Sequence, residues 1–156
     1  MLKYKGTRDK FHPKAFHLRC DGVSHSVSLL KTKKGLSIAA YTSAPWDSPE
    51  EWTYATDKDA IVLNLTSRLV FPCKDPSKAI QSRYGKGPMF GKQELYFNSE
   101  PFNSNNNCWS YLSGPAYGFT PREDGASMLT EETVDKYNST GSTIVEMEVW
   151  QIIYLD

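Results

Sequence analysis

The sequence predicts an α+β protein that is mostly β, built as a two-sheet sandwich with short helices at its sides. Segments of alternating or β-branched residues recur along the 156-residue chain, separated by stretches rich in Gly, Pro, Asn and Ser. Only two stretches carry the signals of a helix start. Aromatic residues make up 13% of the chain, which is enough for a substantial core without disulfides or metal. We therefore expect a single domain over residues 1–156.

The first expected elements are a short helix and a hairpin. Residues 13–19 begin at a proline that suits the first turn of a helix, and this helix is expected to end near Asp21. Residues 26–30 and 36–42 read as strands and flank Gly35, which suits the positive φ of a hairpin turn. This pair is the clearest hairpin in the sequence.

A second hairpin is expected in the middle of the chain. Residues 60–65 are apolar and β-branched, which is typical of a buried strand, and residues 69–71 continue the pattern after a turn. Pro72 ends this strand because proline cannot donate a hydrogen bond to the sheet. Residues 74–93 are rich in Gly and Pro and are expected to form turns, and a strand returns at residues 94–97.

The last third of the chain is predicted to hold a loop, a helix and a long strand. Residues 98–107 are mostly Asn and Ser, as in a surface loop, and residues 109–112 form a short strand. Residues 128–137 are a helical candidate because Thr130 is able to cap the helix. Residues 142–155 are β-branched and alternating, and they predict a long closing strand.

This closing strand carries two glutamates among apolar residues. Alternation places Glu146 and Glu148 on one face with Trp150, and places Val145 and Met147 on the other. Paired carboxylates at this spacing are able to perform acid/base chemistry. Glutamates that accept hydrogen bonds from the backbone N–H groups of a neighbouring loop also explain the pattern, and we favour this structural interpretation.

Charge and composition argue against several classes of protein. Lys plus Arg and Asp plus Glu number 18 each, whereas a nucleic-acid-binding domain shows a basic excess or a dense basic stripe. The densest basic cluster, residues 31–34, falls at the predicted hairpin turn. No apolar run approaches the roughly 20 residues needed to cross a bilayer, so no membrane insertion is expected. Three widely spaced cysteines and the lack of a hydrophobic signal region favour a reducing, cytoplasmic location.

No residue pattern assembles a catalytic, metal or cofactor site. His17 and Cys20 lie three residues apart and His25 follows, but structural zinc requires four ligands, typically in closely spaced pairs. No serine lies in a nucleophile elbow, and residues 85–91 lack the Gly-Lys-Ser/Thr ending of a phosphate-binding loop. Cys73, beside a lysine, is the best candidate for thiol chemistry. We expect no catalytic residue, no metal and no cofactor.

Five stretches of the chain, in order, resemble the TLDc domain family. An opening segment at residues 4–21 precedes a hairpin with the family's G-x-Y/F-x-S-x-P-W signature, in which Ala40 stands where a glycine is common. Residues 59–65 are similar to an apolar strand of the family, and residues 87–96 to its G-P-x-F-G-x-x-D-L-x-I block, in which Glu94 replaces the usual aspartate. The closing strand resembles the family's E-x-E-V-W/F/Y ending. The motif residues are Tyr41, Ser43, Pro45, Trp46, Gly87, Pro88, Phe90, Gly91, Glu146, Glu148 and Trp150.

The resemblance implies a sandwich of two antiparallel sheets flanked by helices, and no established catalytic activity. It implies structural roles for the motif residues. Pro45 and Trp46 hold a loop on the sandwich, Gly87 and Gly91 let the chain turn around Phe90, and the two glutamates satisfy loop amides. It also implies an association with resistance to oxidative stress and with binding to the vacuolar proton-pumping ATPase.

Three hypotheses for the function follow. The leading one is a non-enzymatic protein-interaction domain that docks onto a cytosolic complex, with the catalytic sector of the vacuolar proton-pumping ATPase as the family-level candidate. The first alternative is a redox-active or hydrolytic domain that uses Glu146, Glu148 or a cysteine. The second is a structural component of a larger cytoskeletal or multiprotein assembly. No nucleic acid is expected as a partner, and no insertion into a membrane is expected.

Overall fold

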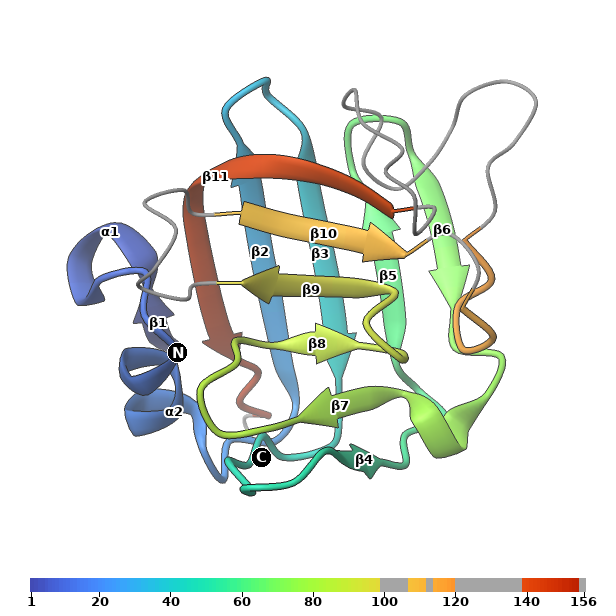
Figure 1. Cartoon of the computed structure of the whole chain (residues 1–156), viewed down its shortest axis with the longest axis horizontal. Helices are drawn as coiled ribbons and strands as arrows, with labels where there is room; N and C mark the ends of the chain where they lie inside the picture. The colour runs from blue at the N-terminus through green and yellow to red at the C-terminus, as the bar shows by residue number, and fades with distance from the viewer. Residues whose placement is uncertain (99–106, 112–113, 120–138, 155–156) are drawn as a thin grey trace.

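In the computed structural model of the chain, two antiparallel sheets pack face to face with a few short helices. The described residues are 1–98, 107–111, 114–119 and 139–154. Strands predominate and the helices are few and short, so the predicted mostly β sandwich is confirmed. Figure 1 shows one sheet in front of the other, with the strands of the two sheets crossing.

The first sheet has the strand order β1-β11-β2-β3-β5-β6 and is antiparallel throughout. The predicted hairpin around Gly35 forms its centre, and the φ of Gly35 is +94° as a tight turn requires. The second predicted hairpin follows beside it as β5 and β6. The strands of this sheet are β1 Leu2–Lys5, β2 Ser26–Thr32, β3 Ser37–Thr42, β5 Ile61–Asn64, β6 Leu69–Pro72 and β11 Ser139–Gln151.

The second sheet has the order β4-β7-β8-β9-β10-β11 and is also antiparallel. Residues 74–93, expected to be turns, also contain β7 and β8. These strands have three and two residues, too few for alternation to be visible in the sequence. The helix expected at residues 128–137 lies outside the described residues. The strands are β4 Thr53–Ala55, β7 Ile80–Ser82, β8 Met89–Phe90, β9 Leu95–Asn98 and β10 Asn107–Tyr111.

Strand β11 belongs to both sheets and forms the corner between them (Figure 1). Its first part pairs with β10, and its second part pairs with β2 and β1. The register with β2 shifts between Ile144 and Glu146, which leaves Val145 as an extra residue. Such a bulge bends a strand and increases its twist, and strands that switch sheets commonly use one. Val145 is consequently 42% exposed whereas Met147 is buried, and the prediction that these two side chains share one face is wrong.

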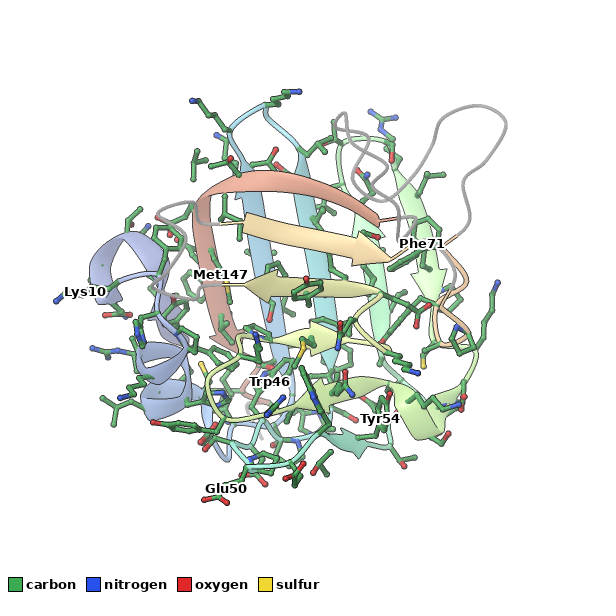
Figure 2. The ribbon with its side chains drawn as sticks, in the orientation of Figure 1. Lys10, Trp46, Glu50, Tyr54, Phe71 and Met147 are labelled. Atoms are coloured by element: carbon green, nitrogen blue, oxygen red, sulfur yellow. The ribbon has the colours of Figure 1, made fainter. Side chains whose placement is uncertain are left out.

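In the part of the chain that the structure describes, three short helical segments accompany the sheets. They are α1 Gly6–Asp9, α2 Pro13–Cys20 and the 3-10 helix η1 Pro76–Lys78. The predicted helix at residues 13–19 is therefore confirmed. Helices α1 and α2 lie at the edge of the sandwich formed by β1, and Lys10 points away from the molecule there (Figures 1 and 2).

An aromatic cluster fills the space between the sheets. The indole of Trp46 is 1% exposed and packs edge-on against Phe16 and Phe90, at ring-centroid distances of 5.5 and 5.6 Å (Figure 2). Phe90 in turn lies 6.4 Å from Tyr117, which stacks on Phe119 at 5.7 Å. Because these rings come from α2, from the loop after β3, from β8 and from residues 114–119, the cluster ties distant parts of the chain together.

Candidate functional site

The outer face of the first sheet, meaning the face turned away from the second sheet, is mostly apolar. Directly paired residues of neighbouring strands share a face, so the register gives the rows of side chains that cross it. Two adjacent rows run from β1 to β6. The first row is Leu2, Trp150, Val27, Tyr41, Ile61 and Pro72, and the second is Lys5, Glu148, Leu29, Ala39, Leu63 and Val70.

This apolar outer face is unusual, because the solvent side of an antiparallel sheet is commonly polar. On it, Trp150 and Val70 are 39% and 57% exposed, and Leu65, just after β5, is 50% exposed. In strand β2, the polar residues Ser26 and Ser28 face the interior and are buried, which leaves apolar residues of this strand on the outer face. Contiguous apolar surface of this kind marks interaction sites in soluble proteins.

A groove of about 290 Å³ opens on the outer face near the β2–β3 hairpin. Its walls come from β11, β2, β3 and the residue that follows β5. The two motif glutamates of β11 therefore lie beside apolar side chains rather than in a polar cleft. The lining residues include Leu29, Lys31, Ser37, Leu65, Glu146 and Glu148.

The two glutamates are engaged by the N-terminal segment. Glu146 accepts hydrogen bonds from the N–H of Thr7 at 3.2 Å and from its hydroxyl at 2.5 Å. Glu148 bonds two side chains instead of loop amides, the Lys5 ammonium and the Trp150 indole N–H, each at 2.8 Å. The Lys5 Nζ also lies 3.7 Å from Glu146. The hydrogen bond from Lys5 lowers the pKa of Glu148, so this carboxylate stays ionised.

Ser43 binds a buried carboxylate that sequence reasoning missed. Asp57 is 4% exposed and accepts hydrogen bonds from the N–H and the hydroxyl of Ser43, at 2.6 and 2.8 Å. Thr42 and the N–H of Asp59 donate two more, at 2.7 and 2.9 Å. Burial alone would raise the pKa of Asp57, but these hydrogen bonds outweigh it and hold the pKa below its ordinary value. The sequence offered one local sign of this arrangement. An aspartate such as Asp57 commonly accepts a hydrogen bond from the N–H two residues later, here that of Asp59, in an Asx turn.

Tyr41, on β3, lies at the opposite end of the outer face from the groove. Its hydroxyl is 3.1 Å from Nδ1 of His25. The ring of His25 packs edge-on against that of Tyr154, at 5.7 Å. The segment after β11 therefore extends the apolar surface at this end, where Tyr154 is exposed.

Trp46 fixes the loop after β3 against the rest of the sandwich. Its indole N–H donates to the Ser26 hydroxyl at 2.9 Å. Its backbone N–H bonds the carbonyl of Val23 at 3.3 Å, and its own carbonyl accepts from Gly22 at 2.8 Å. Pro45 is exposed beside it. This is the geometry of a loop pinned to the core by one side chain.

The Gly-Pro-Met-Phe-Gly block at residues 87–91 brings the chain close to β9. A Cβ on Gly87 would lie 2.7 Å from the carbonyl oxygen of Phe97. Gly91 has a φ of +66°, and a Cβ there would collide with the carboxylate of Glu94. Glycine is therefore required at both positions. Between them, the block buries Pro88 and Phe90.

Glu94 is the residue that satisfies a row of loop amides. Its side chain is fully buried and accepts hydrogen bonds from the N–H groups of Ala116, Tyr117 and Gly118, at 3.0, 2.9 and 3.2 Å. The sequence assigned this kind of role to the glutamates of β11. In the sequence, Glu94 stood out only because it replaces the family's usual aspartate. Its role could not be predicted, because its amide partners lie more than twenty residues later in the chain.

Both ring nitrogens of His17 are engaged by acceptors. Nδ1 lies 2.7 Å from the carboxylate of Asp21, and Nε2 lies 2.8 and 3.2 Å from the carbonyls of Lys86 and Arg83. His17 thereby links α2 to the loop before β8. Within the described part of the chain, no three His, Cys, Asp or Glu side chains gather in a way that could hold a metal ion.

Burial favours the protonated form of the two cysteine thiols that the structure describes, those of Cys20 and Cys73. Cys20 is fully buried, and burial raises the pKa of its thiol to about 12. Burial also raises the pKa of Cys73, the cysteine favoured by the sequence for thiol chemistry. A reactive cysteine requires the opposite shift, because the thiolate is the nucleophile. The side chain of Cys108 lies outside the described residues.

The comparison with known families agrees with this structure. A family model of the TLDc domain matches residues 1–153. The chain therefore belongs to the TLDc domain family, which is associated in general terms with oxidative stress and suggests a role in protein interaction. No curated protein matches the chain. Among the described residues, no helix has the length and apolar character to cross a membrane.

Proposed function

We propose that the chain is a non-enzymatic protein-interaction domain that works in the cytoplasm by docking onto a larger protein complex. The family's association makes the vacuolar proton-pumping ATPase the candidate complex. The observation that carries the proposal is the apolar outer face of the first sheet, where neighbouring strands present apolar side chains to solvent. A partner that covers this face removes apolar area from water, which favours association.

The state of the reactive groups supports the non-enzymatic part of the proposal. Residues of the N-terminal segment donate hydrogen bonds to both Glu146 and Glu148. The two carboxylates are therefore not a free pair available for acid/base catalysis. The thiols of Cys20 and Cys73 have raised pKa values, which disfavours the redox alternative.

Binding of the full chain to the purified catalytic sector of the vacuolar proton-pumping ATPase tests the proposal. We expect biolayer interferometry to detect a complex at micromolar concentration or below. Val70→Asp, on the outer face, should weaken it, whereas Leu18→Asp should not, because Leu18 is 86% exposed on α2 and outside the face. Absence of binding at micromolar concentration refutes the candidate partner, and equal binding by Val70→Asp refutes the surface.

A cysteine-free chain tests the redox alternative. Cys20 is replaced by Ala, to suit its buried site, and Cys73 and Cys108 by Ser, with circular dichroism to verify the fold. The proposal expects this variant to protect cells from peroxide as well as the wild type does. Loss of protection by the folded variant would favour thiol chemistry instead.

A further inference from the structure

The groove on the outer face lies over strands whose backbones are already paired. In the order β1-β11-β2-β3-β5-β6, strands β11, β2 and β3 each have a hydrogen-bonded neighbour on both sides. A partner is unable to add a strand here, because β-strand addition requires a free sheet edge. The remaining mode is contact through side chains, as when an amphipathic helix lays its apolar face into a groove.

The size and lining of the groove suit anchoring side chains rather than a small ligand. Its volume of about 290 Å³ lies at the lower limit of ordinary small-molecule sites. Besides the core residues Leu30 and Ile38, its apolar lining comes from Leu29, which is half-buried, and Leu65, which is half exposed. An aliphatic side chain of a partner that enters between them covers apolar surface on both.

The charges around the groove are unequal. On its β11 wall, Nζ of Lys5 lies 2.8 Å from Glu148 and 3.7 Å from Glu146, so one positive charge faces two carboxylates. At the hairpin end, Lys31, Lys33 and Arg68 form no ion pair with any residue that the structure describes. The two hairpin tips, residues 31–37 and 64–69, contain no acidic residue. The unpaired charge at the hairpin end of the groove is therefore positive, opposite in sign to the glutamates of the β11 wall.

We propose that this groove binds an amphipathic helix of a partner protein, with aliphatic residues on one face and Asp or Glu along its flank. The aliphatic residues fill the space between Leu29 and Leu65. The acidic flank faces Lys31, Lys33 and Arg68. This assignment rests on the proposed function, since it names the chemistry of the element that docks on the outer face.

A synthetic helical peptide provides the probe. It is fluorescein-labelled, about 18 residues or five helical turns long, with Leu on one face and Glu on the flank. A matched peptide carries Lys in place of each Glu. Fluorescence anisotropy with the full chain should show tighter binding of the acidic peptide, and this preference should shrink as salt is added.

Two variants and two controls locate the binding. We expect Leu65→Asp and Lys31→Glu each to weaken binding of the acidic peptide at least about tenfold, the usual effect of losing a central contact. Leu18→Asp and Lys14→Glu, on exposed positions of α2, should leave it unchanged. The basic peptide should bind Lys31→Glu better than it binds the wild type.

Several outcomes would overturn the assignment. These are failure of the wild type to bind the acidic peptide at millimolar concentration, equal affinity for both peptides, and unchanged binding by Leu65→Asp. A wild-type dimer in sedimentation that Leu65→Asp dissociates would assign the groove to a second copy of the chain.

The two proposals fail separately. If the wild type, Leu65→Asp and Lys31→Glu bind the ATPase sector equally, the groove assignment is wrong and docking stands. If the wild type binds the acidic peptide but not the ATPase sector, the groove assignment stands and the candidate complex is wrong.

Discussion

The carboxylate of Glu94 lies 2.9 Å from the backbone nitrogen of Tyr117, a residue 23 positions later in the chain. The flanking amides of Ala116 and Gly118 point at the same carboxylate. Tyr117 is held from its other end as well, because its hydroxyl donates to the carbonyl of Ala79 at 2.7 Å. One buried glutamate thus attaches residues 114–119 to the sandwich and positions an aromatic ring of the core.

Replacement of Glu94 by Gln should destabilise the fold. The new NH2 group is a donor that faces backbone donors, so buried N–H groups lose an acceptor. We expect the free energy of unfolding to fall by about 2–4 kcal/mol, the cost of losing charge-assisted hydrogen bonds and leaving buried donors unpaired. Urea denaturation measures it, with the exposed Glu50→Gln as the control. Equal stability of the two variants would contradict the role given to Glu94.

The lowered pKa of Asp9 predicts that the folded protein loses stability at acidic pH. The carboxylate of Asp9 is bound by Arg8, by the N–H of Lys5 at 2.9 Å and by Arg19 at 3.1 Å. The hydrogen bond from Arg8 is the main cause that lowers its pKa from 3.8 to about 2. Because the pKa in the folded state is the lower one, the stabilisation is complete above about pH 4 and is lost as the pH falls toward 2.

Thermal unfolding between pH 5 and 2 checks this prediction. Asp9→Asn should unfold at a lower temperature than the wild type near pH 5, and the difference should narrow as the pH approaches 2, because the wild-type carboxylate is then protonated. A difference that stays constant with pH would show that Asp9 acts through packing rather than through its charge.

The sequence predicted those helices and strands that are long enough to show a periodic pattern within their own residues. The hairpin around Gly35 and helix α2 fall where alternation, glycine and the first-turn proline placed them. Strands β4, β7 and β8 have only two or three residues and exist because neighbours pair with them. The alternation of β11 also failed at Val145, because a bulge depends on where the strand changes partner.

The candidate site was only partly readable. The sequence singled out Glu146 and Glu148, which lie on the wall of the groove. It gave no indication that Leu29 and Leu65 lie beside them, because these positions meet only through the pairing of β11, β2, β3 and β5. Side chains that share an outer face come from strands far apart in the chain, and register is a tertiary property.

Cys20 should resist alkylation in the folded protein. Its thiol is fully buried with a pKa of about 12, so the thiolate is scarce and the reagent has no access. Iodoacetamide at pH 8 followed by peptide mass spectrometry should find Cys20 modified only after denaturant is added. The half-buried Cys73 should react sooner, which provides an internal reference. Rapid labelling of Cys20 without denaturant would contradict its place in the core.

Deletion of Val145 should disrupt the corner between the sheets. Without the extra residue, Ile144 and Glu146 become consecutive, and the pairing of β11 with β2 is able to continue without interruption. The bend that carries the strand over to β10 is lost, since a bulge is what kinks it. We expect a loss of more than about 3 kcal/mol, typical of a broken structural feature.

The exposed side chain of Val145 contributes little, so Val145→Thr keeps the bulge and should stay within about 0.5 kcal/mol of the wild type. Hydrogen exchange distinguishes local from global damage after the deletion. The amides of β10 and of the first part of β11 should lose protection before those of β2 and β3, because only the former depend on the bend. If the deletion variant keeps both its stability and the protection of β10, the bulge is dispensable and β11 turns the corner by twist alone.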